Sequence, residues 1–520
     1  MSSFKILPLL FLIASAAQAQ TKVFKEVAAD ISSDLELIRQ DGKLVGYVMF
    51  TQLEKASEDS FNYKLTIMDE NLNDIGAVNF RQEKLNLKGV SFEQDILCLA
   101  YIKSNFVGRE YSNGREFRRE SANAHTGLYT QFVNLSGKII ATNTIAMEIR
   151  PESQLAAGSN RKVVGNGRLK QNIQLRNITR RGFACFYGDD SRNNLVVYSV
   201  AGKLIWQKQI HDDATNFTML TSGTEVHLLA KLKDPMKEGG FEVLSYNTTD
   251  STVYPKFLLK DRKGNSLKAL AFDNDPVSGK PFVSGMVIDP KRGNNFESVK
   301  DLTRGPYCGV FAISLNGHTK KDIQASFSYW NDGSKSFVDK HGYYQNAGAY
   351  ANVERSFRDY QGNTYFAACQ IKRQFAVGTL IGSVLTLPFI YPPALLLGTG
   401  LHRYTSRDVL LLKQDPTGKL VLTNTVPALK GPRALPGTSL YTYGPNYYTV
   451  TNPDTRTNYL VVDDQKRINI YNINQSKIAR TIPHQEGNSL VTVFPAKEGY
   501  VMVYEYNQKE KTTRMSIESL

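Results

Sequence analysis

One pattern recurs along this chain of 520 residues and restricts its fold more than any other feature. An alternating apolar run is followed by a short polar turn, often ending in Gly-Lys, and then by a second alternating run, as in LVVYSVAGKLIWQKQI. Alternation at period two gives each strand one buried face, and a Gly or Asn in the turn accepts the positive φ of a tight hairpin. The copies predict β-hairpins centred on Leu72, Gly137, Gly202, Thr249, Gly317, Gly418, Ser476 and, more weakly, Lys509.

Another short apolar run precedes most of these hairpins, which gives three or four strands per unit. Examples are DILCLAYIK, GFACFYG, EVHLLAKL, TYFAACQI and NYLVVDD. Regular multi-strand units without an intervening helical pattern favour radial repetition, which leaves few sheet edges exposed. We therefore predict an all-β chain with one β-propeller domain over residues 20–520. Seven blades are preferred and eight are the alternative, while two or three stacked β-sandwich domains are the competing architecture.

The last unit is short, so a closed ring needs a further strand for it. The strand-like residues Leu44 to Leu53 offer one and are predicted to complete that blade.

One hairpin carries a more specific likeness. The segment LVVYSVAGKLIWQKQI resembles the blade hairpin of pyrroloquinoline-quinone-type propellers, in which a Gly-Lys turn precedes an apolar strand bearing Trp; Trp206 has that position. The other hairpins match only loosely. The resemblance implies a fold and does not imply quinone binding, and no cofactor is predicted.

The first 19 residues have the pattern of a secretory signal peptide. Lys5 supplies a positive start, Ile6 to Ala17 form a short apolar run, and Ala17-Gln18-Ala19 is a small-x-small cleavage signal. The run is too short to span a bilayer. We predict cleavage before Gln20 and export to the periplasm or the cell surface of a bacterium; an uncleaved anchor is the alternative.

Four cysteines lie inside apolar, strand-like runs: Cys98, Cys185, Cys308 and Cys369. Export permits disulfides, but free Cys often serves as a small buried hydrophobe. Buried free thiols are therefore preferred to a disulfide.

The formal net charge is +14, with 41% hydrophobic and 22% charged residues, as in a folded protein. An exported basic protein can meet acidic glycans, lipopolysaccharide or anionic lipid headgroups. Nucleic acid is not predicted as a partner.

An uncharged apolar segment interrupts the pattern at residues 375–401 and is predicted to be an insertion between two strands of one blade. A spanning helix needs about 20 unbroken apolar residues, but Pro388 breaks this run. Basic residues flank it on both sides. The segment either covers the propeller's own apolar surface, contacts a partner, or touches the membrane as a peripheral element. Its candidate contact residues are Phe389, Tyr391 and Leu395.

Two clusters are candidate ligand or partner contacts. The first begins with Arg161, Lys162 and Arg168 and continues through Lys170, Arg176, Arg180 and Arg181; a solvated loop is the preferred interpretation and a contact to polyanions the alternative. The second consists of Tyr441, Tyr443, Tyr447 and Tyr448, which either stack on a ligand or pack as strand residues between blades.

No motif demands a particular chemistry. The runs His211-Asp212-Asp213 and Asp273-Asn274-Asp275 are predicted to be turns, with metal binding as the lesser alternative, and no metal site is predicted. A serine-nucleophile elbow is absent from the sequence. We predict an exported, non-catalytic binding or assembly protein of the cell envelope. An extracellular polysaccharide hydrolase or lyase with a central-channel active site is the alternative, so enzymatic activity stays undecided.

Overall fold

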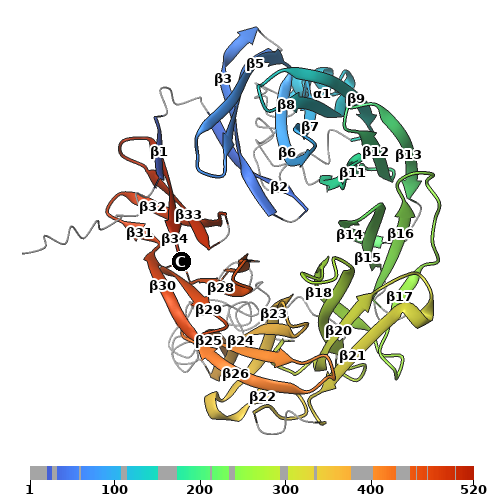
Figure 1. The fold of residues 1–520 in the computed structure, drawn as a ribbon, viewed down its shortest axis with the longest axis vertical. Helices are drawn as coiled ribbons and strands as arrows, with labels where there is room; N and C mark the ends of the chain where they lie inside the picture. Colours follow the sequence, from blue (N-terminus) through green and yellow to red (C-terminus); the bar gives the residue numbers. More distant parts are fainter. Residues whose placement is uncertain are drawn as a thin grey trace, which may run out of the picture.

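The computed structural model describes most of the chain as a ring of eight antiparallel sheets, an eight-bladed β-propeller (Figure 1). The described residues are 20–25, 32–41, 43–57, 60–106, 114–149, 173–210, 214–233, 240–292, 302–332, 337–375, 402–428, 446–452, 454–464, 466–497 and 499–520.

The first four blades each contain four strands, which follow one another from the innermost outward. They are β2 (Ser32–Gln40), β3 (Lys43–Ser57), β4 (Ser60–Asp69) and β5 (Asp74–Gln82); β6 (Lys84–Glu93), β7 (Ile96–Ser104), β8 (Thr126–Asn134) and β9 (Ile139–Met147); β10 (Ile173–Ile178), β11 (Gly182–Gly188), β12 (Asn193–Ser199) and β13 (Leu204–Ile210); and β14 (Ala214–Ser222), β15 (Glu225–Leu232), β16 (Phe241–Asn247) and β17 (Phe257–Leu259). The helix α1 (Gly114–Ala122) lies between β7 and β8 in sequence.

The remaining blades follow the same plan, with a two-residue strand added to the inner edge of the sixth and eighth. They are β18 (Leu267–Asn274), β19 (Pro281–Ile288), β20 (Tyr307–Leu315) and β21 (Ile323–Tyr329); β22 (Tyr343–Tyr344), β23 (Ala349–Arg358), β24 (Thr364–Phe375), β25 (His402–Gln414) and β26 (Leu420–Val426); β27 (Asn446–Asn452), β28 (Thr457–Asp463), β29 (Arg467–Asn472) and β30 (Lys477–Pro483); and β31 (Gln485–Glu486), β32 (Ser489–Pro495), β33 (Tyr500–Asn507), β34 (Thr512–Ser519) and β1 (Gln20–Lys25).

Each predicted hairpin belongs to a different blade. The first seven are the third and fourth strands of their blades, and the copy around Lys509 forms β33 and β34. The propeller prediction is therefore confirmed, with the alternative count of eight blades rather than the preferred seven.

The ring closes through the two ends of the chain. β1 pairs antiparallel with β34, from Gln20 opposite Ile517 to Lys25 opposite Thr512, so the N-terminal strand is the outermost strand of the last blade (Figure 1). The prediction that Leu44 to Leu53 complete this blade is wrong, because these residues lie in β3 of the first blade. Period-two alternation identifies a strand but does not choose its partner.

Apolar packing between neighbouring blades holds the ring together. Each of the eight described core clusters joins two adjacent blades, and the cluster containing Met49, Met68, Met502 and Met515 joins the last blade to the first. The preference for free thiols is confirmed, since all four cysteines are free and all but the partly buried Cys308 are buried. Trp206 donates its indole N–H to the carbonyl of Thr248 in the next blade at 2.9 Å.

A repeated polar turn explains the Gly-Lys signal of the sequence. In the turn after β23, an Asp359 carboxylate oxygen accepts the backbone N–H groups of Gln361 and Asn363, and Gly362 adopts a φ of 79°. Asp261 and Asp415 cap equivalent turns that contain a glycine at the same position. These carboxylates satisfy backbone donors that a tight turn leaves open.

The strand directions divide the connections between two faces of the ring. Because all strands in a blade are antiparallel, the first-to-second and third-to-fourth turns lie on one face, which we call the turn face. The second-to-third and blade-to-blade connections lie on the opposite face, which we call the connection face. Phe375 pairs with His402, so β24 ends and β25 begins on the connection face. Residues 376–401, the bulk of the apolar segment, lie outside the described residues.

None of the helices in the described ranges is both long and apolar enough to cross a membrane.

Deletion of residues 20–25 should destabilise the ring, because β34 then exposes an unpaired backbone edge. We expect the midpoint of thermal unfolding, followed by circular dichroism, to fall by at least ~5 °C. Val23→Ala is the control, since this side chain is 61% exposed and its loss should shift the midpoint by less than about 1 °C. An unchanged midpoint after the deletion would contradict closure by β1.

Candidate functional site: the charged centre of the ring

Four charged side chains come from the first long strands of four different blades. Arg39 lies on β2, Arg176 on β10, Asp273 on β18 and Arg355 on β23. Each occupies the second half of its strand, and these four strands run towards the turn face. We call these four residues the arginine cluster.

The charges of the cluster act on one another. Desolvation by the surrounding wall raises the pKa of Asp273, while the N–H of Asn274 and the charges of Arg355, Arg176 and Arg39 oppose that rise. Desolvation likewise lowers the pKa values of Arg39 and Arg176, and the negative charge of Asp273 opposes both shifts. The fold therefore places these side chains, which are far apart in sequence, within electrostatic reach of one another at the ring centre.

Water reaches the cluster although protein surrounds it. Arg39, Arg176 and Asp273 are exposed to solvent, whereas Arg355 is only partly exposed. Three guanidinium groups against one carboxylate leave an excess of two positive charges. Arg355 also has a buried Nε atom without a hydrogen-bond partner among the described residues. A buried donor without a partner is costly.

Burial raises the pKa values of two carboxyl groups, Glu354 on β23 and Glu36 on β2. Burial raises the pKa of Glu354 to about 7, against the opposing effects of the Asn352 amide and the charge of Lys268. The Asn352 amide donates to Glu354 at 3.2 Å. Burial, with a contribution from Asp34, also raises the pKa of Glu36 on β2.

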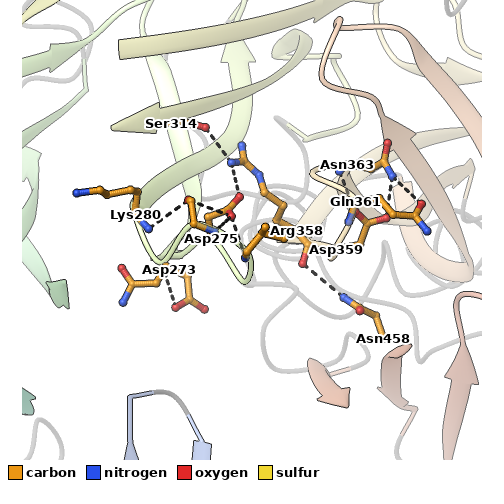
Figure 2. A network of polar contacts seen from close by, with 12 residues as sticks. Asp273, Asp275, Lys280, Ser314, Arg358, Asp359, Gln361, Asn363 and Asn458 are labelled. Atoms are coloured by element: carbon orange, nitrogen blue, oxygen red, sulfur yellow. Dashed lines mark hydrogen bonds and ion pairs between the residues drawn. The ribbon is translucent and has the colours of Figure 1, made fainter. Parts of the chain in front are cut away.

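A polar network fixes the end of β18, from which Asp273 projects (Figure 2). One guanidinium nitrogen of Arg358 donates to Asp275 at 2.9 Å and to Ser314 at 2.8 Å. The Asn458 amide donates to the carbonyl of Arg358 at 3.4 Å, so the network spans the fifth, sixth and seventh blades. It holds the strand end that carries the one negative charge of the arginine cluster.

Asp275 caps a turn, so the turn interpretation of Asp273-Asn274-Asp275 holds only for Asp275, whereas Asp273 and Asn274 are the last residues of β18. One carboxylate oxygen accepts the N–H groups of Val277 and Ser278. Burial opposes ionisation, but these N–H groups and Arg358 outweigh it and hold the pKa of Asp275 below its usual range. In the described part of the chain, no group of three or more His, Cys, Asp or Glu side chains is arranged to hold a metal ion.

Most sequence-predicted contact residues lie outside the described residues: Arg161, Lys162, Arg168, Phe389, Tyr391, Leu395, Tyr441 and Tyr443. The same holds for His211-Asp212-Asp213. Tyr447 and Tyr448 belong to the backbone of β27, opposite Val462 and Val461, and their side chains are not described.

Arg176 corrects one part of the prediction. The basic stretch that includes it was predicted to be a loop, but Arg176 lies in β10 and belongs to the arginine cluster. Sequence reasoning missed Arg39 and Arg355 altogether. The signal that could have found them was a charged residue in the first strand of a unit, where the inward face of a propeller strand lines the ring centre.

Comparisons with known proteins add little to the fold and the cluster. Residues 1–107 match a family of unknown function, DUF6770. The chain matches no curated protein sequence. Apo AztD from Citrobacter koseri is 8% identical, with 91% of this chain and 96% of that chain covered and a TM-score of 0.38. The WD40 domain of SCAP from fission yeast is 9% identical, with coverages of 94% and 98% and a TM-score of 0.37. With similarity this low, the propeller assignment rests on the sheets of this chain.

Arg358→Ala should destabilise the protein by about 3 kcal/mol, because it leaves Asp275 and Ser314 without their shared donor in a partly buried site. Arg81→Ala is the matched control, since exposed Arg81 bonds only Ser60 among the contacts described. Chemical unfolding of both variants measures the difference. Equal losses in the two variants would argue against a structural role for the network.

Glu354→Gln should stabilise the protein at alkaline pH. Folding opposes ionisation of Glu354, so the wild type loses stability as pH rises from the ordinary carboxyl pKa through about 7. We expect the variant to be more stable on the order of 2 kcal/mol at about pH 8 and nearly equal to the wild type at about pH 4. A pH-independent difference, measured by urea unfolding, would contradict the raised pKa.

Proposed function

We propose that this protein is an exported, non-catalytic binding protein that captures an anionic component of the cell envelope, such as an acidic glycan, at the centre of the ring. The observation that carries the proposal is the arginine cluster, in which three arginines from three blades act electrostatically on a single carboxylate.

The chemistry of guanidinium groups supports an anionic ligand. Arginine presents a planar fork of donors that matches carboxylate, sulfate and phosphate groups, and it stays charged even where desolvation lowers its pKa. Three positive charges against one negative charge attract anions, and solvent reaches Arg39 and Arg176. The net charge of +14 adds a general attraction for polyanions.

The N-terminal sequence supports export to the periplasm or the cell surface. The predicted cleavage point precedes Gln20, and Gln20 is the first residue of β1. Cleavage there would remove the signal peptide and leave the closing strand complete.

The insertion at residues 375–401 supports a second contact with the envelope. Its flanking strands end on the connection face, opposite the face towards which the arginine cluster lies. Docking on a membrane or an envelope protein through this segment would leave the turn-face end of the ring centre open. Cell fractionation of a variant with a Gly/Ser linker at 376–401 tests this: loss of membrane association supports docking, and retained association contradicts it.

A polysaccharide hydrolase or lyase is the second candidate, and the carboxyl groups of Glu354 and Glu36 favour it. A carboxyl with a pKa near 7 can donate or accept a proton at physiological pH. Both candidates use an anionic chain at the ring centre, and they differ in whether that chain is cleaved.

The test titrates hexagalacturonate into the mature protein at low salt by calorimetry, with neutral cellohexaose as the comparison. Arg39→Gln, Arg176→Gln and Arg355→Gln should each weaken hexagalacturonate binding about 10-fold and reduce its salt dependence. Arg262→Gln, which removes an exposed charge from the turn between β17 and β18, is the matched control.

Equal binding by the central variants and the control would contradict the site. Release of shorter or unsaturated fragments during the titration would overturn the non-catalytic role and support the enzyme. Abolition of that release by Glu354→Gln would then assign the acid–base group.

A further inference from the structure

A second hollow lies between the fourth and fifth blades, away from the arginine cluster. Three turns of the turn face enclose it: residues 222–225, 278–281 and 315–318. Its volume is about 620 Å³, within the range of roughly 300–1,000 Å³ of small-molecule sites. We infer that this cavity binds a neutral sugar unit, an activity that goes beyond the anion binding proposed above.

One wall of the cavity is a chain of polar side chains centred on Glu225. Its carboxylate lies 2.9 Å from Nε2 of His318 and 3.4 Å from Nε2 of His227. Nδ1 of His227 lies 2.8 Å from the hydroxyl of Ser245. Each side chain of this wall is oriented by a neighbour, which gives a ligand a rigid set of donors and acceptors.

The rings of this wall are also held in place. Tyr254 stacks on His318 with 3.6 Å between ring centroids and 6° between the planes. The hydroxyl of Ser222 donates to the carbonyl of Gly279 at 2.8 Å and ties two of the three turns together. The cavity is therefore built by contacts between two blades and does not depend on one loop.

The lining of the cavity also has an apolar part. This part consists of Val243, Pro255, Phe257, Leu315 and Ile323. Phe257 and Pro255 offer flat surfaces for the C–H face of a pyranose ring, and the polar wall meets the hydroxyl groups at its edge.

The charges of the lining favour a neutral ligand. Glu225 and Lys280 carry opposite charges at the cavity. Burial lowers the pKa of His227 to about 4, against the charge of Glu225, so this imidazole is neutral at physiological pH. Neither an anion nor a cation is favoured by these opposite charges. The hydroxyl groups of a sugar can donate to the Glu225 carboxylate and to Nδ1 of His318, because Nε2 of His318 already donates to Glu225.

The experiment measures binding of glucose, galactose, mannose, N-acetylglucosamine and their β-1,4-linked disaccharides by saturation-transfer NMR and calorimetry. We expect at least one to bind the wild type at millimolar or lower concentration. Glu225→Gln, which keeps the shape of the side chain, and Phe257→Ala should each weaken that sugar about 10-fold or more.

His125→Phe is the matched control, because it also removes a histidine that lies beside a glutamate, with 3.1 Å between His125 Nε2 and Glu83. His125 is exposed and does not line the cavity. The His125→Phe variant should leave sugar binding unchanged, as should Arg39→Gln. Thermal unfolding checks that every variant folds. His318→Phe preserves stacking on Tyr254 but removes the hydrogen-bonding nitrogens of His318, so it should also weaken sugar binding.

Two results would overturn the inference: no sugar of the panel binds the wild type, or the bound sugar is unaffected by Glu225→Gln, His318→Phe and Phe257→Ala alike. Neither result bears on the anion-binding proposal, because that proposal is tested separately, by hexagalacturonate binding to the central arginine variants.

Discussion

The pairing of β1 with β34 joins the two ends of the chain, and the rest of the ring depends on it. A propeller blade packs its faces against two neighbours, so one open junction would leave two apolar faces exposed to water. The methionine-rich cluster between the last and first blades is buried only because this junction is closed. Burial of apolar surface and backbone pairing therefore act together at the same place.

Closure also creates the chemistry of the centre. Arg39, Arg176 and Arg355 lie on strands of the first, third and sixth blades, and none of them neighbours another in sequence. An isolated blade would expose its arginine to bulk water, where the charges would interact weakly. The ring replaces much of that water by protein, which strengthens the interaction of each arginine with Asp273 and makes their shared positive field available to a ligand.

Turns capped by carboxylates occur on both faces of the ring. Asp261 caps the turn between β17 and β18 on the connection face, and Asp359 and Asp415 cap turns of the turn face. The same face carries the Arg358 network and the walls of the cavity between the fourth and fifth blades. Sites that need a defined geometry are thus gathered where short turns hold the backbone, while the longer connections, including the apolar insertion, belong to the opposite face.

The sequence by itself determined the elements. The alternating runs and polar turns predicted one hairpin in each blade, and the apolar contexts of the four cysteines predicted free thiols. Both features are local and depend on which residues stand next to each other. Only the tertiary structure decided the blade count and the strand that closes the ring, since alternation does not name a partner for a strand at the far end of the chain. It also decided the arginine cluster and the wall of Glu225, His227 and His318, because their members come from separate strands or turns and meet only when the blades are arranged in a ring. A single charged residue in a strand carries no local signal of the charges that it will face.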